Sequence, residues 1–457
     1  MSDKERPNVL LLMCDQLRHD FVGYAGAAFA DTPNLDRLAT RGTAFTQCYS
    51  NSPVCTPARI GLATGQMPHR LGRPGNNTYL PFSARTYYQQ MREAGYYVGC
   101  SGKLDIAKPD LYCGNGALPR NYAWGFTHPH EVMGGMDLTQ RDDPGCPYSR
   151  WLDENGLWET FHNDYRTRKG DDWLDKQFRD SRLPTEAHED VYIGRKACEI
   201  IESFPDDNPW HMFVSFVGPH DPQDPPTEYA EQFRDADVPE PIPFREEGKP
   251  RTLVKKATFF DYDEASPRRT RQQYLSMIKC IDDQIGRILD TVEARGEMDK
   301  TVILFTSDHG DHLFDYNLHG KHTGYESSWH IPLLAAGPGV QEGATCDALV
   351  ELIDIPNTIC DLARIDRMQN VDSMSFGPVA RGENADHRED VVMMLENTSA
   401  IFDGRYKFIN TINDRNELYD LQEDPQELNN IIDENSKQAG EMSKRLKWRL
   451  MTGGCQR

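Results

Sequence analysis

A cysteine, a proline and an arginine lie close together in VCTPARIGLATG, residues 54–65. Proline is favoured in the first turn of a helix, because its missing N–H leaves no helical hydrogen bond unmade there. The segment therefore predicts a helix that begins near Cys55, with Pro57 in its first turn and Arg59 one turn from the thiol. The N-terminus of a helix favours anions. Cys55 is thus a candidate reactive centre, with a small buried side chain as the alternative interpretation.

Polar residues also follow four short apolar segments at the point where each segment ends. The segments are residues 8–13, 96–100, 211–217 and 301–306. The residues that follow them, in the same order, are Asp15 and Gln16, Lys103 and Asp105, His220, and Asp308 with His309. In open α/β sheets, ligands bind beyond the carboxyl ends of the strands. Taken alone, most of these motifs are more typical of an ordinary loop or a surface charge, but together they predict one site.

The residues at the strand ends combine hard oxygen donors with one imidazole. The candidate metal ligands are Asp15, Gln16, Asp308 and His309. Such sets suit calcium, magnesium or manganese better than zinc. A divalent ion there would polarise an ester and lower the pKa of a bound hydroxyl. The cations expected to make the site attractive to an anionic ester are Arg59, Lys103, His220 and Lys321.

Helical periodicity alternates with the apolar segments and predicts the elements that must position these side chains. It covers residues 32–42, 83–95, 185–204 and 270–296. Continuous apolar strands are typical of a parallel sheet that is covered on both faces. The expected fold class is therefore α/β, with a mostly parallel central sheet flanked by helices.

Two stretches, 105–185 and 219–268, interrupt the alternation and are expected to be long loops that shape a substrate pocket. The first of them contains four tryptophans that could stack on a sugar or aryl ring or belong to the core: Trp124, Trp151, Trp158 and Trp173. After about residue 380 short strand-like pieces predict a small antiparallel subdomain followed by a helix. We expect a catalytic domain at 1–380 and a C-terminal subdomain at 381–457.

The composition excludes several classes of partner. Fifty basic and 72 acidic residues give a formal net charge of −22, which disfavours binding to nucleic acid or an anionic membrane. No apolar run approaches the roughly 20 residues of a membrane span. The N-terminal apolar run is too short for a signal peptide, so a cytoplasmic protein is expected. Eleven cysteines without a CxxC pair indicate reduced thiols rather than a disulfide framework or zinc ribbon.

Taken together, the motifs resemble those of the type I sulfatases of the alkaline phosphatase superfamily. CTPAR at Cys55 to Arg59, followed by ATG, is similar to their maturation signature, Cys-x-Pro-x-Arg with Thr-Gly downstream. The resemblance extends from NVLLLMCDQ through GKLD, PHDP and SDHGDHLFDYNLHGKHTGYE to NELYDLQEDPQELNNI, nearly the whole chain. It implies an alkaline phosphatase-like fold and a sulfuric ester hydrolase.

The resemblance also implies roles for individual residues. A formylglycine-generating or radical maturation enzyme would oxidise Cys55 to Cα-formylglycine, and Arg59 would hold its hydrated form. The metal ligands would be Asp15, Gln16, Asp308 and His309, with calcium favoured over magnesium or manganese. The residues that bind sulfate or protonate the leaving group would be Lys103, His220 and Lys321, with Asn76 near the substrate.

Two positions depart from the common family pattern. Gln16 replaces the second aspartate of an Asp-Asp pair, as in the choline sulfatase and phosphonate hydrolase branches. Asp105 replaces a histidine that contacts sulfate, and a carboxylate facing a sulfate oxygen would repel it. Asp105 is therefore expected to be protonated, or to turn toward a cation, a ligand or a substrate hydroxyl.

The expected substrate is a sulfated sugar or another small organic sulfate, and the oligomeric state stays open. The first alternative is a phosphonate monoester or phosphodiester hydrolase that uses the same nucleophile. An alternative of another class is a non-catalytic metal- or carbohydrate-binding relative, in which Cys55 stays a thiol.

Overall fold

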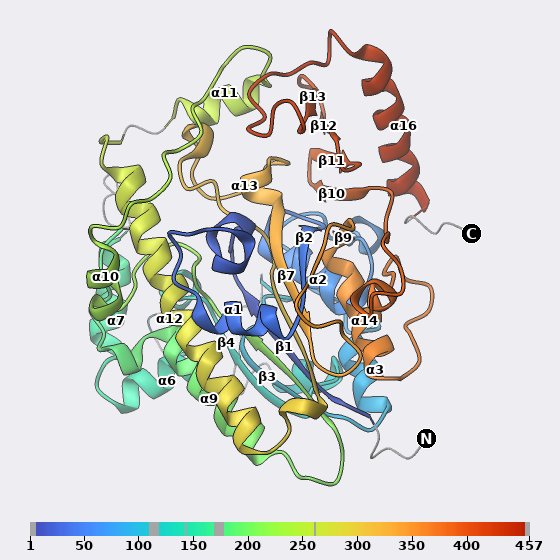
Figure 1. Ribbon diagram of the computed structural model, residues 1–457. Helices are drawn as coiled ribbons and strands as arrows, with labels where there is room; N and C mark the ends of the chain where they lie inside the picture. The colour runs from blue at the N-terminus through green and yellow to red at the C-terminus, as the bar shows by residue number, and fades with distance from the viewer. Residues whose placement is uncertain are drawn as a thin grey trace.

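A nine-stranded sheet lies at the centre of the computed structural model, which describes residues 6–108, 118–140, 142, 144–168, 178–259 and 262–452 (Figure 1). The strand order is β4-β3-β5-β1-β6-β7-β2-β8, and β9 pairs with β2. The bounds are β1 Asn8–Cys14, β2 Gly42–Tyr49, β3 Tyr97–Lys103, β4 His128–Val132, β5 Trp210–Ser215, β6 Thr301–Ser307, β7 His330–Ala336, β8 Ala344–Cys346 and β9 Val350–Glu351.

The strands in the middle of this sheet are parallel and covered on both faces. Strand β1 pairs in parallel with β5 and β6, and β3 pairs in parallel with β4 and β5. Alternate residues of β1 point to opposite faces, so Leu10 and Leu12 pack in one core cluster and Val9 and Leu11 in another. Both faces are apolar for this reason, and the predicted α/β fold with a mostly parallel sheet is confirmed.

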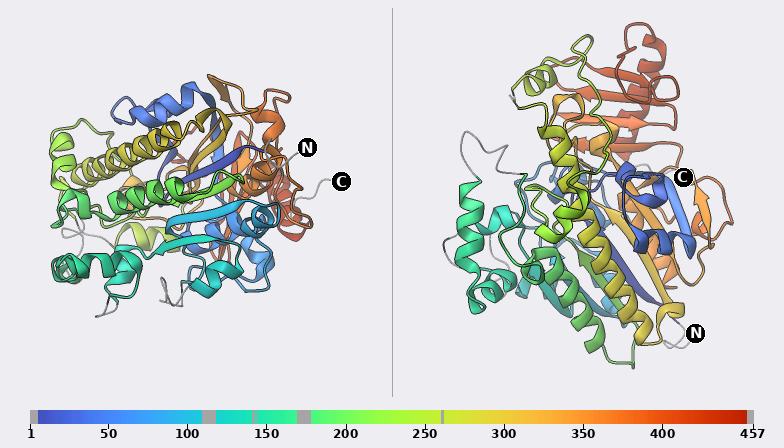
Figure 2. Two further views of the ribbon diagram at one scale, coloured as in Figure 1. Left: turned by 90° about the horizontal axis from the view of Figure 1, so that it is seen from below. Right: turned by 60° about the vertical axis from the view of Figure 1, so that its left-hand side comes forward.

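Helices cover the two faces of the sheet, and α9 and α12 run side by side on one of them (Figures 1 and 2). That face is covered by α1 Pro33–Thr40, α9 Glu189–Ser203 and α12 Ser266–Ala294. The other face carries α2 Cys55–Thr64, α3 Tyr87–Glu93 and α14 Ile355–Leu362. Each predicted helix occurs with ends shifted by one to four residues, and 185–188 forms a 3-10 turn that precedes α9.

The stretches expected to be long loops contain regular elements, so that expectation was wrong in part. Residues 105–185 include β4 at the edge of the sheet, and β2 and β7 also lie outside the four predicted strands. Strand β4 reads HPHEV and has no apolar run, because an edge strand buries less of its surface. The described parts of the two stretches contain α4 Leu118–Ala123, α5 Gly135–Leu138, α6 Pro147–Glu154, α7 Trp158–Thr167, α10 Thr227–Phe233, α11 Arg251–Ala257 and the start of α12.

A four-stranded antiparallel sheet near the C-terminus confirms the predicted small subdomain; it lies at the top of Figure 1. Its strands are β10 Val391–Leu395, β11 Thr398–Phe402, β12 Tyr406–Thr411 and β13 Glu417–Asp420, and α16 Ser436–Thr452 follows them. One face packs on α16 through Ile401, Phe408 and Met442. The other packs on α13 Glu326–Trp329. The boundary between residues 380 and 381 stays a prediction.

In the described ranges, no helix combines the length and the apolar character that crossing a membrane requires. The nine cysteines of these ranges are free thiols.

Candidate active site

The carboxyl ends of four adjacent parallel strands bring the predicted residues together. In the order β3-β5-β1-β6, Lys103 ends β3, Asp15 follows β1 and Asp308 follows β6. His220 lies on the segment after β5. The backbone N–H of Gln16 donates to Oδ1 of Asp308 at 3.0 Å, which joins the ends of β1 and β6. The predicted residues therefore lie together at the carboxyl ends of the parallel strands.

Cys55 is the first residue of α2 and is fully buried. Its Sγ lies 3.3 Å from Nε2 of His309, 3.4 Å from Nζ of Lys321 and 3.9 Å from Nζ of Lys103. Burial raises the pKa of the Cys55 thiol, but Lys103, Lys321 and His309 oppose it and hold the pKa well below the usual value. The position therefore favours an anion at the N-terminus of α2.

Arg59 lies one turn along α2 and joins the two aspartates of the site. Its Nε donates to Oδ2 of Asp308 at 2.7 Å, and an Nη donates to Oδ2 of Asp15 at 3.1 Å. The other Nη donates to Oγ of Ser215 at 2.8 Å. Asp15 also accepts from Nζ of Lys103 at 2.6 Å. Burial and Cys55 raise the pKa of Asp15, but Lys103, His220 and Arg59 prevail and hold it below the usual range.

Four fully buried groups could hold a divalent metal ion. The ligand atoms of Asp15, Cys55, Asp308 and His309 all lie within 4.8 Å of one another. Nδ1 of His309 is 3.0 Å from the carbonyl oxygen of Gly310, which leaves Nε2 to face the centre of the cluster. Two carboxylates and one imidazole fit calcium, magnesium or manganese.

Gln16 lies beside this cluster, and its amide is engaged with other side chains. Its Nε2 donates to a carboxylate oxygen of Asp311 and, at 3.4 Å, to Oδ1 of Asp221. Its Oε1 accepts from Nζ of Lys321. The amide thereby links the candidate ligands to Lys321. Sequence reasoning did not select Asp221 or Asp311, although both stand in motifs that it used, PHDP and SDHGD.

His220 and Lys321 line a pocket beside Cys55. Nδ1 of His220 lies 2.7 Å from the carbonyl oxygen of Asp221, which leaves Nε2 as the ring nitrogen available to exchange a proton. Burial and Lys321 lower the pKa of His220, but Asp221 and Asp15 outweigh them and raise it above the usual value. The raised pKa favours the protonated form of His220.

Asn76 and Asp105 contact the first turn of α2. Oδ1 of Asn76 accepts the backbone N–H of Thr56 at 3.0 Å. A carboxylate oxygen of Asp105 lies 3.2 Å from Nζ of Lys108, 3.7 Å from Nζ of Lys103 and 3.5 Å from Oγ1 of Thr56. The structure therefore places the Asp105 carboxylate beside two cations.

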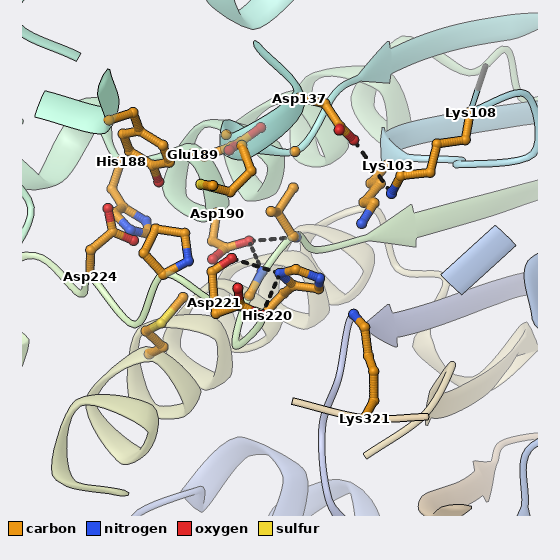
Figure 3. Close-up of a pocket in the computed structure, with 18 of the residues that line it drawn as sticks. Lys103, Lys108, Asp137, His188, Glu189, Asp190, His220, Asp221, Asp224 and Lys321 are labelled. Carbon is orange, nitrogen blue, oxygen red and sulfur yellow. Dashed lines mark hydrogen bonds and ion pairs between the residues drawn. The ribbon is translucent and has the colours of Figure 1, made fainter. Parts of the chain in front are cut away.

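A pocket of about 260 Å³ is lined by Lys103 and Lys321, whose Nζ atoms lie near Sγ of Cys55 (Figure 3). The predicted residues that line it are Asn76, Lys103, His220 and Lys321. Sequence reasoning missed Lys108 and three acidic lining residues, Glu189, Asp190 and Asp224. Glu189 and Asp190 lie in the first turn of α9, where acidic residues are common and carry no distinctive signal. The lining does not include Trp124, Trp151 or Trp158, of which the first and last are buried in core clusters. Trp173 lies outside the described residues.

Comparison with known proteins places these features in one family. The sequence pattern of the family described as "Sulfatase" matches residues 7–365, and "N-sulphoglucosamine sulphohydrolase, C-terminal" matches residues 314–454. The chain is 28% identical to an arylsulfatase of Clostridium perfringens, over 93% of this chain and 90% of the relative. It is 30% identical to a choline-sulfatase of Rhizobium meliloti, over 94% of this chain and 83% of the relative.

Solved structures show the same fold. The phosphonate monoester hydrolase of Agrobacterium radiobacter superposes with a TM-score of 0.83 at 23% identity, covering 98% of this chain and 96% of that one. A protein solved with its substrate D-glucosamine-2-N,6-O-disulfate superposes with a TM-score of 0.76 at 20% identity, covering 98% of both chains.

Proposed function

We propose, from the premise that this chain belongs to the sulfatase family, that it cleaves the sulfate monoester of a small organic alcohol with a nucleophile made from Cys55. Family membership makes the chain a sulfuric ester hydrolase. The observation that carries the proposal is the position of Cys55 at the start of α2, where Lys103, Lys321 and His309 surround Sγ. A maturation enzyme would convert this thiol to Cα-formylglycine, whose hydrate supplies a nucleophilic hydroxyl.

Four side chains around Cys55 would have separate roles in the reaction. Lys103 and Lys321 would bind sulfate oxygens, because both ammonium groups face the position of Sγ. Arg59 would keep Asp15 and Asp308 in place. His220 would give its proton to the departing alkoxide, since its Nδ1 is held by the backbone and its pKa is raised.

A divalent ion held by Asp15, Asp308 and His309, with Gln16 as a further candidate, would supply Lewis acidity to the ester and lower the pKa of the nucleophilic hydroxyl. Calcium fits the oxygen-rich donors best, and magnesium and manganese are the alternatives.

Phosphonate monoester hydrolysis is the second candidate function, favoured by Gln16 in place of a second aspartate. The test compares kcat/KM for nitrophenyl sulfate and nitrophenyl phenylphosphonate. We expect the sulfate to be preferred, and we expect Cys55→Ala to abolish turnover of both. A preference for the phosphonate would support the second function. Full activity of Cys55→Ala would exclude both.

A further inference from the structure

The pocket beside Cys55 has opposite charges at its two ends. Lys103 and Lys321, whose Nζ atoms lie 3.9 and 3.4 Å from Sγ of Cys55, occupy the nucleophile end. Three acidic residues line the opposite wall: Glu189, Asp190 and Asp224. Figure 3 shows these carboxyl groups across the pocket from Lys321, with His220 and Asp221 between them. A ligand that fills this pocket therefore meets cations at one end and carboxyl groups at the other.

The three acidic residues differ in how they are compensated within the protein. Asp224 lies 3.3 Å from the guanidinium of Arg168. Asp190 accepts the backbone N–H groups of Val217 at 2.8 Å and Gly218 at 3.1 Å. Glu189 is 6% exposed, and its Oε1 has no hydrogen-bond partner among the described residues. A buried carboxyl oxygen without a partner is costly, so Glu189 is the group left for a ligand to satisfy.

We propose that Glu189 and its acidic neighbours form a subsite for a protonated amine on the alcohol part of the substrate. The substrate class is then the sulfate ester of an amino alcohol or a single amino sugar, a zwitterion that matches both ends of the pocket. The inference rests on the proposed function, because the lysine end must receive the sulfate. The volume of about 260 Å³ is enough for one small unit.

The unpartnered atoms favour an amine that carries N–H groups over a quaternary ammonium. Besides Oε1 of Glu189, Nδ1 of the buried His188 has no hydrogen-bond partner in the described ranges, and His188 lines the same wall. Both atoms can accept an N–H. A trimethylammonium group offers none and is instead recognised by aromatic rings. Tyr165 is the sole Phe, Tyr or Trp among the described residues that line the pocket.

The electrostatics of Glu189 support the same ligand. Burial raises the pKa of the Glu189 carboxyl, Asp190 and Asp224 raise it further, and the more distant Lys103 opposes them only in part. Among the described residues, no cation forms an ion pair with this carboxyl. An ammonium group supplies that charge and, through its N–H bonds, also satisfies the oxygen.

The test measures kcat/KM of the mature enzyme on 2-aminoethyl sulfate, 2-hydroxyethyl sulfate, choline sulfate and nitrophenyl sulfate. We expect the primary amine to exceed the hydroxyl analogue by about 100-fold, because a site built for an N–H group rejects ligands that lack it. The same comparison with glucosamine 6-sulfate and glucose 6-sulfate extends the test to sugars. In Glu189→Gln the ratio of amine to hydroxyl substrate should collapse toward one. Glu202→Gln removes an exposed carboxylate from the same helix and should keep the wild-type ratio.

The outcomes separate this inference from the proposed function. Failure to hydrolyse nitrophenyl sulfate and every other sulfate ester would overturn the proposed function itself. Hydrolysis of sulfate esters with equal kcat/KM for amine and hydroxyl substrates would overturn the amine subsite alone. A preference for choline sulfate over 2-aminoethyl sulfate would also overturn it, because the assignment depends on N–H donors. The wild-type ratios decide the question even where Glu189→Gln folds poorly.

Discussion

Arg59 is the residue that holds the two candidate metal-binding aspartates in place. It is 2% exposed and donates to both Asp15 and Asp308, which are fully buried. Removing one partner of a buried ion pair leaves the other charge buried and unpaired, which lowers the stability of the fold by about 3–5 kcal/mol. We therefore expect Arg59→Met to lower the free energy of unfolding by about this amount in chelated protein, as measured by urea denaturation.

Calcium should return part of the stability that Arg59→Met loses, because a bound cation again neutralises the two aspartates. Arg85→Met is the matched control, since Arg85 forms an exposed pair with Glu93 and should cost less than about 1 kcal/mol. Equal stability of chelated wild type and Arg59→Met would show that Arg59 does not hold the aspartates.

Asp105 is the clearest departure from the family pattern, and its contacts suggest a role in placing lysines. Its carboxylate lies 3.2 Å from Nζ of Lys108 and 3.7 Å from Nζ of Lys103, and its φ is 53°. Asn tolerates this left-handed conformation, so Asp105→Asn removes the charge with little backbone strain. We expect a loss of about tenfold in kcat/KM, larger on the preferred ester than on nitrophenyl sulfate.

A substrate-independent loss in Asp105→Asn would instead assign Asp105 to the general structure of the site. Activity equal to wild type on every ester would show that Asp105 takes no part. Lys108→Met removes the other member of this ion pair. If Asp105 acts through Lys108, this variant should also lose more kcat/KM on the preferred ester than on nitrophenyl sulfate.

At the scale of single residues, sequence reasoning predicted which side chains lie close together where a motif joins a strand end to a chemically distinctive side chain. Asp15, Lys103 and Asp308 were predicted in this way and lie around Cys55. Ser215, which accepts a hydrogen bond from Arg59, and Glu189 were not predicted. Serine in an apolar strand and glutamate at a helix start are common everywhere, so only the fold reveals what they face.

At the scale of elements, β4 carries a buried carboxyl group at the edge of the sheet. Glu131 is 8% exposed and accepts from Nδ2 of Asn121 at 3.1 Å. Burial raises the pKa of Glu131 to about 7, although Asn121 and Arg120 oppose the shift. The folded state therefore holds this proton more tightly than the unfolded state. The associated stability is complete below about pH 4.5 and is lost as the pH rises through about 7.

Glu131→Gln removes this titration. As the pH rises, the free energy of unfolding of the variant should increase by about 3 kcal/mol relative to that of wild type. Most of this increase should occur between about pH 5 and pH 8. The measurement is the difference between variant and wild type in urea denaturation at both pH values, which cancels titrations common to the two proteins. Glu293→Gln, an exposed position on α12, should show no such trend. A pH-independent difference for Glu131→Gln would contradict the assignment.

The strands of the central sheet that the sequence predicted are those buried on both faces. Strands β1, β3, β5 and β6 contain continuous apolar runs, and each was expected. Strand β2 mixes threonine and glutamine with apolar residues, and β7 includes a proline, so neither produced such a run. Their places in the sheet depend on pairing with each other and with β6, which a single-sequence pattern does not show.

At the scale of the whole molecule, the small C-terminal sheet supports the segment that carries Lys321. Lys407 on β12 is fully buried and donates to Glu326 at 2.5 Å and to Glu427 at 2.8 Å. Glu326 begins α13, five residues after Lys321. Tyr325 donates to Glu417 of β13 at 2.5 Å. These contacts tie the candidate sulfate-binding lysine to the C-terminal sheet.

Lys407→Met should therefore affect both stability and catalysis. It leaves Glu427 buried without its cation, and we expect a loss of about 3 kcal/mol in free energy of unfolding. Displacement of α13 should also lower kcat/KM of the folded fraction through Lys321. Urea denaturation and steady-state kinetics at low temperature measure the two effects. Lys447→Met, an exposed position on α16, serves as control. Wild-type values for Lys407→Met would show that the two sheets are not coupled in this way.

The central claim, that Cys55 is the precursor of the nucleophile, is tested most directly by the mass of the peptide that contains residues 54–65. The sample is enzyme that hydrolyses nitrophenyl sulfate, made in a host that matures sulfatases. We predict that the peptide has lost the sulfur of Cys55 and carries an aldehyde, in proportion to the specific activity of each preparation. Full activity in a preparation whose Cys55 peptide retains its thiol would contradict the account.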